Sequence, residues 1–202
     1  YTTLFRSAQY LNDVFNSVLL KDVVSRNNIR DTELLNRIIQ FIFDNVGSTF
    51  SAKNISDFLK SQGRKLGVET TYNYLDYLEN AFVIERVKRF DLKGKKYLET
   101  QEKIYAADVG IRNSVLGYRP SDIAGILENL LYLNLRQKGF RVSVGKMGTL
   151  EVDFVASKDE EVLYVQVCYQ LTPENLEREI APLKQIKDNY PKLVLTLSDL
   201  MT

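Results

Sequence analysis

The chain has 202 residues, of which 45% are hydrophobic and 26% are charged, which is typical of a globular protein and excludes the disordered, collagen-like and disulfide-scaffold classes. Its net charge of +1 indicates neither a nucleic acid nor a membrane surface as a partner. A single cysteine excludes an internal disulfide, and the absence of histidine excludes Ser-His catalysis, Cys-His catalysis and any His-ligated metal site. The single cysteine fits a reducing cytosol, so we expect a cytoplasmic protein. No apolar stretch is long enough to cross a bilayer, so we expect no membrane segment.

Residues 1–30 are expected to form a helical linker. Apolar side chains recur there at the i, i+3 and i+4 spacing of an amphipathic helix, at Leu11, Val14, Phe15, Val18 and Leu19. This apolar face has two interpretations: it packs on the segment that follows, or it belongs with a domain upstream. The chain opens on Tyr1 without a methionine, so we expect it to be a piece of a longer protein.

Residues 31–103 are predicted to form a winged-helix domain. Three helices are expected, the first with an apolar face over Leu34–Ile42, the second beginning after Ser51, and the third over Glu69–Asn80. Two strands around a turn then form a β-hairpin, over Phe82–Phe90 and Lys96–Tyr105. Three helices followed by a hairpin is the winged-helix arrangement, which is related to helix-turn-helix DNA-binding proteins.

The hairpin, more than the third helix, carries the charge that DNA binding requires. The third helix has no Lys or Arg between Glu69 and Asn80, although a helix that faces phosphates usually carries basic side chains. The hairpin is rich in basic residues, and we expect DNA contacts from Arg86, Lys88, Arg89, Lys93, Lys95 and Lys96. The alternative is that these side chains are solvated and only protect a sheet edge from pairing.

Residues 104–202 are predicted to form a second, α+β domain. A helix over about 121–138 is followed by three strands, over 140–146, 150–157 and 162–171. Thr172 and Pro173 then begin a helix, and a last strand covers 192–197. The order αβββαβ predicts a mixed sheet flanked by helices.

Three polar residues interrupt apolar runs in this second domain, and such residues are the most informative about function. They are Glu128 in the first helix, Asp153 in the second strand and Gln166 in the third strand. Neighbouring strands would present Asp153 and Gln166 side by side. A buried carboxylate needs a cation, a hydrogen-bond donor or a proton, so Asp153 either takes part in chemistry or is satisfied by Gln166 alone.

These residues resemble the active site of the PD-(D/E)XK nuclease superfamily. In that superfamily a helical Glu, a strand Asp and a Glu-or-Gln-x-Lys motif gather around Mg²⁺. The resemblance implies that Glu128, Asp153 and Gln166 form the catalytic set, with Glu128 and Asp153 as the ligands of a Mg²⁺ ion. The motif here reads Gln166-Val167-Cys168, so a neutral thiol stands at the expected lysine position and cannot supply an ammonium group. Lys146 is an alternative source of that charge.

The order of the segments also resembles the C-terminal half of a prokaryotic AAA-type ATPase family, in which a lid, a winged helix and a nuclease-like domain follow the ATPase core. The most family-like stretches are Lys103–Gly110 and Leu150–Val155. Tyr10–Arg26 resembles the helix that leads from the lid to the linker, so the resemblance implies that residues 1–30 are the remnant of a lid. Because the chain has no P-loop sequence, the resemblance implies that ATP binds only in an upstream ATPase domain, which would also be a partner.

Three functions remain open at this point. The first is nucleic-acid association, with DNA as the expected partner and the nuclease-like site degenerate. The second is an active Mg²⁺-dependent nuclease that uses Glu128, Asp153 and Gln166. The third is a protein-docking module that binds no nucleic acid.

Overall fold

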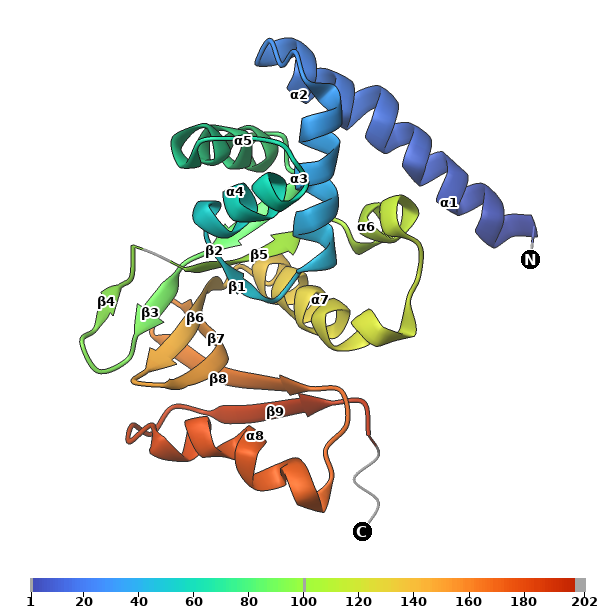
Figure 1. Ribbon diagram of the computed structural model, residues 1–202. Helices are drawn as coiled ribbons and strands as arrows, with labels where there is room; N and C mark the ends of the chain where they lie inside the picture. Colours follow the sequence, from blue (N-terminus) through green and yellow to red (C-terminus); the bar gives the residue numbers. More distant parts are fainter. Residues whose placement is uncertain (1, 100, 199–202) are drawn as a thin grey trace. The chain divides into compact units, whose positions relative to one another are not determined.

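The computed structural model describes residues 2–99 and 101–198, apart from the side chains of residues 2–7, 18 and 19 (Figure 1). Helices and mixed strands confirm the predicted α+β class. The chain divides into two compact units, Tyr1–Arg86 with Ile104–Pro120, and Val87–Lys103 with Ser121–Thr202. The chain therefore passes from unit 1 to unit 2, returns to unit 1 and then enters unit 2 again. These units have other boundaries than the expected segments 1–30, 31–103 and 104–202.

Unit 1 combines helices with a small sheet. Its helices are α1 (Thr2–Val14), a π-helical segment (Phe15–Leu20), α2 (Lys21–Arg26), α3 (Thr32–Asp44), α4 (Ala52–Ser61), α5 (Val68–Asn80) and α6 (Val109–Leu116). Its strands are β1 (Thr49–Phe50), β2 (Ile84–Val87) and β5 (Glu102–Ala106), of which β2 ends and β5 begins at the boundary with unit 2. They are ordered β1-β5-β2 in one sheet.

Side-chain caps define where the helices of unit 1 begin. Asp31 accepts a hydrogen bond from the Leu34 N–H at 2.9 Å at the start of α3. Ser51 and Asn54 form a reciprocal capping box at the start of α4, as expected from the sequence. Asp108 accepts from the Ile111 N–H at 2.8 Å and begins α6. Each cap satisfies a backbone donor that has no partner within its helix.

The core of unit 1 forms on the apolar face of α3. Its side chains Leu35, Ile38, Ile39 and Ile42 are fully buried. Phe15 is also buried, with its ring 6.4 Å from that of Phe43 on α3, so this part of the first apolar face packs on the segment that follows it. The side chains of Val18 and Leu19, which belong to the same predicted face, lie outside the described residues.

Unit 2 is built on a mixed sheet of order β4-β3-β6-β7-β8-β9. The strands are β3 (Arg89–Asp91), β4 (Lys96–Tyr97), β6 (Arg141–Met147), β7 (Leu150–Lys158), β8 (Glu161–Cys168) and β9 (Lys192–Thr196). The pairs β3–β6 and β8–β9 are parallel, whereas the other neighbours are antiparallel. The helices are α7 (Ile123–Gln137) and α8 (Pro173–Gln185), and Figure 1 shows α8 running alongside β8 and β9.

From α7 to β9 the elements follow the predicted order αβββαβ. The N–H of Thr172 donates to Asn175 Oδ1 at 2.8 Å, and Pro173 occupies the first turn of α8, as the sequence predicts. Gly145 lies at a bulge between β6 and β7, where a Cβ atom would come within 2.9 Å of Val155 Cγ2. A larger residue there would push the two strands apart.

The predicted hairpin is divided between the two sheets. The chain forms β2 and then β3, and on its return β4 and then β5. Strands β2 and β5 belong to the three-stranded sheet, whereas β3 and β4 form one edge of the six-stranded sheet. The Leu92 N–H donates to the Lys146 carbonyl at 2.9 Å, which fixes the β3–β4 turn to β6. Among the described residues, no helix is long and apolar enough to cross a membrane.

Candidate functional site

A buried lysine of unit 2, at the start of β5, contacts three carboxylates of the same unit. The ammonium nitrogen of Lys103 lies 2.9 Å from Glu128 Oε1, 3.1 Å from Glu151 Oε1 and 3.2 Å from Asp153 Oδ1. The Lys103 side chain is 5% exposed. We call these four residues the Lys103 cluster. Only close pairing makes burial of so many charges tolerable.

The secondary structure explains why the carboxylates converge. Glu151 and Asp153 are two residues apart on β7, so they point to the same face of the sheet. Glu128 comes from α7, and its carboxylate reaches the same ammonium group. One helix and one strand therefore supply the carboxylates, and a second strand supplies the cation.

The Lys103 ammonium group remains protonated throughout the physiological range. Burial alone would lower its pKa, but the carboxylates of Glu128, Asp153 and Glu151 outweigh burial and raise the pKa above its usual value. A lysine that does not lose its proton cannot act as a general base. Its role in this arrangement is that of a fixed positive charge.

Asp153 and Gln166 lie together, as the sequence predicts, and they bond through the backbone. Asp153 Oδ2 accepts from the Val167 N–H at 2.9 Å, while Gln166 Oε1 accepts from the Asp153 N–H at 3.4 Å. Phe154 on β7 is paired with Val165 on β8, and these two bonds continue the contact between the strands beyond that pair. Burial raises the pKa of Asp153, and the Lys103 charge and the Val167 N–H oppose that rise.

Arg89 on β3 brings a second cation to the cluster. Its side chain is 7% exposed, its Nη1 donates to Gln101 Oε1, and its Nε lies 3.9 Å from Glu151 Oε2. Within the described part of the chain, this Nε is the buried side-chain polar atom without a hydrogen-bond partner. Arg89 is therefore part of the buried charge network and is not presented to solvent.

The thiol of Cys168 contacts residues outside the Lys103 cluster. Its Sγ–H donates to the Gln170 carbonyl at 2.9 Å, and its sulfur lies 4.0 Å from Asn175 Nδ2. Burial raises the pKa of the thiol, which keeps it neutral. Lys146, the expected alternative, donates to the Thr149 carbonyl at 3.3 Å. The ammonium group that lies beside Asp153 is that of Lys103, which sequence reasoning missed.

A Mg²⁺ ion does not fit the Lys103 cluster as it is arranged. The Lys103 ammonium group lies between the carboxylates, where a bound cation would have to be. Across residues 2–99 and 101–198, no group of three His, Cys, Asp or Glu side chains is placed to hold a metal ion. The predicted ligands Glu128 and Asp153 do lie close together, but an internal cation neutralises them.

The six basic residues predicted on the hairpin separate into two sets. Lys88, Lys93, Lys95 and Lys96 are exposed, and none of their ammonium groups has an ion-pair partner among the described residues. Arg89 is buried in the Lys103 cluster, and Arg86 belongs to unit 1, where it lies 2.5 Å from Asp76 Oδ1 and 2.6 Å from Glu79 Oε2. We call the four exposed lysines the hairpin lysines.

Comparison with known proteins gives a family and two similar curated proteins. A Haemophilus influenzae protein named "Uncharacterized protein" is 39% identical over 186 residues, which are 92% of this chain and 46% of that protein. The Methanocaldococcus jannaschii "Uncharacterized protein MJ1544" is 31% identical over 200 residues, 95% of this chain and 44% of that protein. The chain thus spans less than half the length of these relatives, and no solved structure matches it significantly. A family model matches residues 3–122, and the chain belongs to that family, described as "Domain of unknown function (DUF8612)".

Proposed function

We propose that this chain is the nucleic-acid-binding part of a longer AAA-type ATPase, and that it contacts phosphates through the hairpin lysines. The observation that carries the proposal is the exposure of Lys88, Lys93, Lys95 and Lys96 in and beside the β3–β4 hairpin at one edge of the six-stranded sheet, where none has an ion-pair partner among the described residues. Unpaired lysines on one edge supply the positive surface that a phosphate backbone attracts.

The arrangement of each unit supports this proposal. In unit 1 the order α3, β1, α4, α5, β2, β5 with a β1-β5-β2 sheet is typical of winged-helix domains. In unit 2 the order from α7 to β9 and the Lys103 cluster resemble the PD-(D/E)XK nuclease fold. The greater length of the relatives leaves room for an ATPase domain in the whole protein.

The charges on α5 favour contact through the hairpin. Asp76 and Glu79 on α5 bind Arg86, and the helix carries no basic side chain of its own. Phosphates would be repelled by the remaining negative charge on this helix. The hairpin lysines therefore offer the better contact, and we expect binding that depends on charge more than on base sequence.

We further propose that the nuclease-like site does not cut. Lys103 occupies the place between the carboxylates that a divalent ion would take and offsets part of their charge, and its raised pKa excludes it as a base. Cys168 supplies no second ammonium group. The domain would then hold nucleic acid near the ATPase without cleaving it.

A fluorescence-anisotropy titration tests both parts. Labelled duplex and single-stranded DNA are titrated at two salt concentrations, with and without Mn²⁺, and the DNA is then examined on a gel. The triple variant Lys88→Gln, Lys95→Gln, Lys96→Gln is compared with the equally charged control Lys60→Gln, Lys65→Gln, Lys138→Gln, whose lysines are also exposed. Each lost phosphate contact reduces the slope of log affinity against log salt by about 0.9 for duplex DNA.

The expected result is salt-sensitive binding of intact DNA, weakened in the hairpin variant and unchanged in the control. Absence of binding at low salt would contradict the proposal and favour a protein-docking module. Mn²⁺-dependent cutting that Asp153→Ala abolishes would contradict the proposed neutralised site and favour an active nuclease.

A further inference from the structure

A cavity of about 310 Å³ in unit 2 lies next to the hairpin lysines. It is formed by the β3–β4 turn, by Met147 at the end of β6, by Tyr164 of β8 and by the segment that follows α8. None of its lining residues belongs to the Lys103 cluster. Its volume is at the lower end of the ~300–1,000 Å³ range of small-ligand sites, so it fits one small unit of a larger molecule.

One part of the lining is apolar and firmly held. Met147 is 7% exposed, and Leu92 and Ile186 pack against the core residues of unit 2. A methionine sulfur and aliphatic side chains form a surface that a flat aromatic ring can contact. These side chains therefore suit the ring of a nucleobase better than a charged group.

A hydrogen-bond network fixes the opposite part of the lining. Tyr164 Oη donates to Asp188 Oδ2 at 2.6 Å, and Lys192 Nζ donates to Asp188 Oδ1 at 3.1 Å. Burial and the Asp188 carboxylate raise the pKa of Tyr164, so the phenol keeps its proton. Lys192 compensates the charge of Asp188, which removes most of its repulsion toward an anion.

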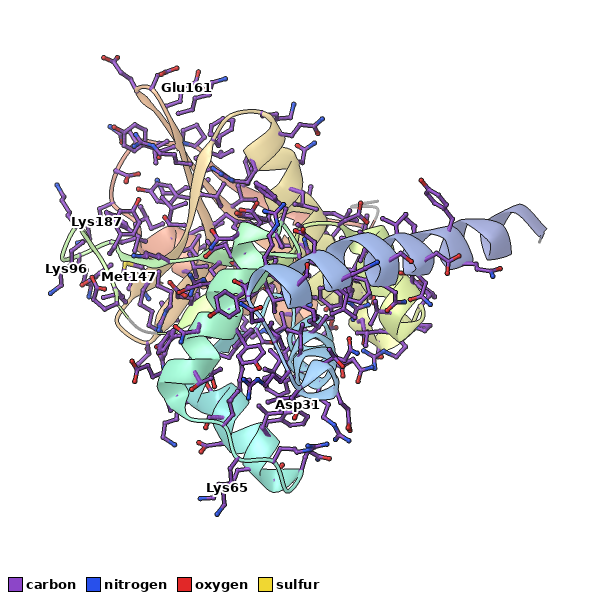
Figure 2. The ribbon with its side chains drawn as sticks, turned by 90° about the horizontal axis from the view of Figure 1, so that it is seen from above. Asp31, Lys65, Lys96, Met147, Glu161 and Lys187 are labelled. Atoms are coloured by element: carbon purple, nitrogen blue, oxygen red, sulfur yellow. The ribbon has the colours of Figure 1, made fainter. Side chains whose placement is uncertain are left out.

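Two lysines that have no ion-pair partner in the part of the chain that the structure describes lie at this cavity. Lys93 and Lys187 line it, and both are exposed, whereas Lys184 in the last turn of α8 binds Glu177 at 3.0 Å. Figure 2 labels Met147 and Lys187, which both line this cavity. An apolar lining flanked by two free ammonium groups matches a ligand that has both an aromatic ring and a phosphate.

We propose that this cavity binds a single nucleotide unit of a nucleic-acid strand, with its base against Met147 and Ile186 and its phosphate at Lys93 and Lys187. The inference rests on the proposed function, because the hairpin lysines would bring the strand to the cavity. A base can enter only when it is unpaired, so single strands bind better than duplexes. Contact with the base is by its ring face, which every base has, so the preference among sequences is small.

Methyl NMR tests the cavity directly, because the chain has only two methionines, Met147 and Met201. Protein labelled with carbon-13 in the methionine methyl groups is titrated with dAMP, and the signals are assigned with Met147→Ala. We expect a saturable shift of the Met147 signal from the ring current of the base. Inorganic phosphate is the control, and an equal shift with phosphate alone would overturn the assignment of the base.

Binding of single-stranded DNA then tests the lysines. Lys187→Gln is expected to weaken binding several-fold and to lower the salt slope by about 0.7, the value for one phosphate contact on a single strand. Lys184→Gln is the matched control and is expected to bind like the wild type. Met147→Ala is expected to lower single-strand affinity about tenfold and to leave duplex affinity unchanged, with Leu193→Ala as its control.

The outcomes separate this inference from the proposed function. DNA binding that persists without a Met147 shift, and with Lys187→Gln equal to wild type, would overturn the cavity and leave the proposed function standing. A Met147 shift with dAMP in a protein that binds no DNA would support the cavity and contradict the proposed function.

Discussion

The ammonium nitrogen of Lys103 lies 3.2 Å from Asp153 Oδ1, although the two residues are 50 positions apart in the chain. Both side chains are nearly buried, and neither charge would be stable at this place without the other. The pair links the start of β5 to β7 within unit 2, and Glu128 and Glu151 also contact the ammonium group. The cation that these carboxylates surround thus belongs to the chain itself.

Lys103→Met is expected to lower the free energy of unfolding by about 3–5 kcal/mol at neutral pH, because it leaves three carboxylates close together without a cation. Urea denaturation measures the loss. Lys146→Met is the control, since its ammonium group contacts only the Thr149 carbonyl, and it should cost less than about 1 kcal/mol.

The stability that Lys103→Met loses should become smaller as the pH falls. Without Lys103 the carboxylates take up protons more readily in the folded than in the unfolded state, so the deficit shrinks as the pH falls toward about 4. The wild-type contribution of Lys103 itself is fully present below about pH 10, because its folded pKa is raised. A deficit that grows on acidification would contradict this account of the cluster.

Asp153→Asn is expected to destabilise the protein more than Glu151→Gln. Asp153 is 12% exposed and binds both the Lys103 ammonium group and the Val167 N–H, whereas Glu151 is 28% exposed. We expect a loss of about 2–4 kcal/mol for Asp153→Asn and about 1 kcal/mol for Glu151→Gln. Chemical denaturation of the two variants side by side gives the comparison, and equal losses would show that Glu151 holds the cluster as firmly as Asp153.

Mn²⁺ and Mg²⁺ are expected to leave the melting temperature of the wild type unchanged. An ion present at about 100 times its Kd would stabilise the folded state by about 2.7 kcal/mol, a shift that differential scanning calorimetry detects easily. Lys103 prevents this by neutralising Glu128 and Asp153. An upward shift in the wild type that disappears in Asp153→Asn would mean that the ion displaces the ammonium group.

Local patterns in the sequence predicted much of unit 2. The strand and helix periods, together with Thr172 and Pro173, gave the order from α7 to β9, and strand alternation placed Asp153 beside Gln166. Lys103 was missed because its partners lie 25 to 50 positions away and no local period reports such a contact. The one available signal is its place directly before the buried run Ile104–Ala106, where a lysine needs a carboxylate.

The basic hairpin shows a second limit of sequence reasoning. Arg86 and Arg89 lie among the hairpin lysines in the chain and look equivalent to them. In the structure, Arg86 binds Asp76 and Glu79, and Arg89 is buried near Glu151. Whether each arginine belongs to unit 1 or to unit 2 depends on the break between β2 and β3. The sequence predicted one continuous strand over Phe82–Phe90, so this break could not be foreseen.

Cys168 is expected to react slowly with a thiol reagent such as DTNB at neutral pH. Its side chain is buried, and burial raises the pKa of its thiol, so the reactive thiolate is scarce. Since the chain has one cysteine, absorbance reports this residue alone. The protein unfolded in urea is the control and should react at the rate of a free thiol. An equally fast reaction in the folded protein would contradict the burial.

Arg86 and Lys96 should have opposite effects on stability and DNA binding. Arg86 is 18% exposed and binds two carboxylates of α5, so Arg86→Gln should cost about 1 kcal/mol of stability and leave DNA affinity nearly unchanged. Lys96 is exposed and has no ion-pair partner among the described residues, so Lys96→Gln should weaken DNA binding at low salt and leave the melting temperature unchanged. Thermal melts give the stability of both variants, and anisotropy titrations give their DNA affinities. Loss of DNA affinity in Arg86→Gln alone would place the contact on unit 1, because Arg86 is the residue of the predicted hairpin set that belongs to that unit.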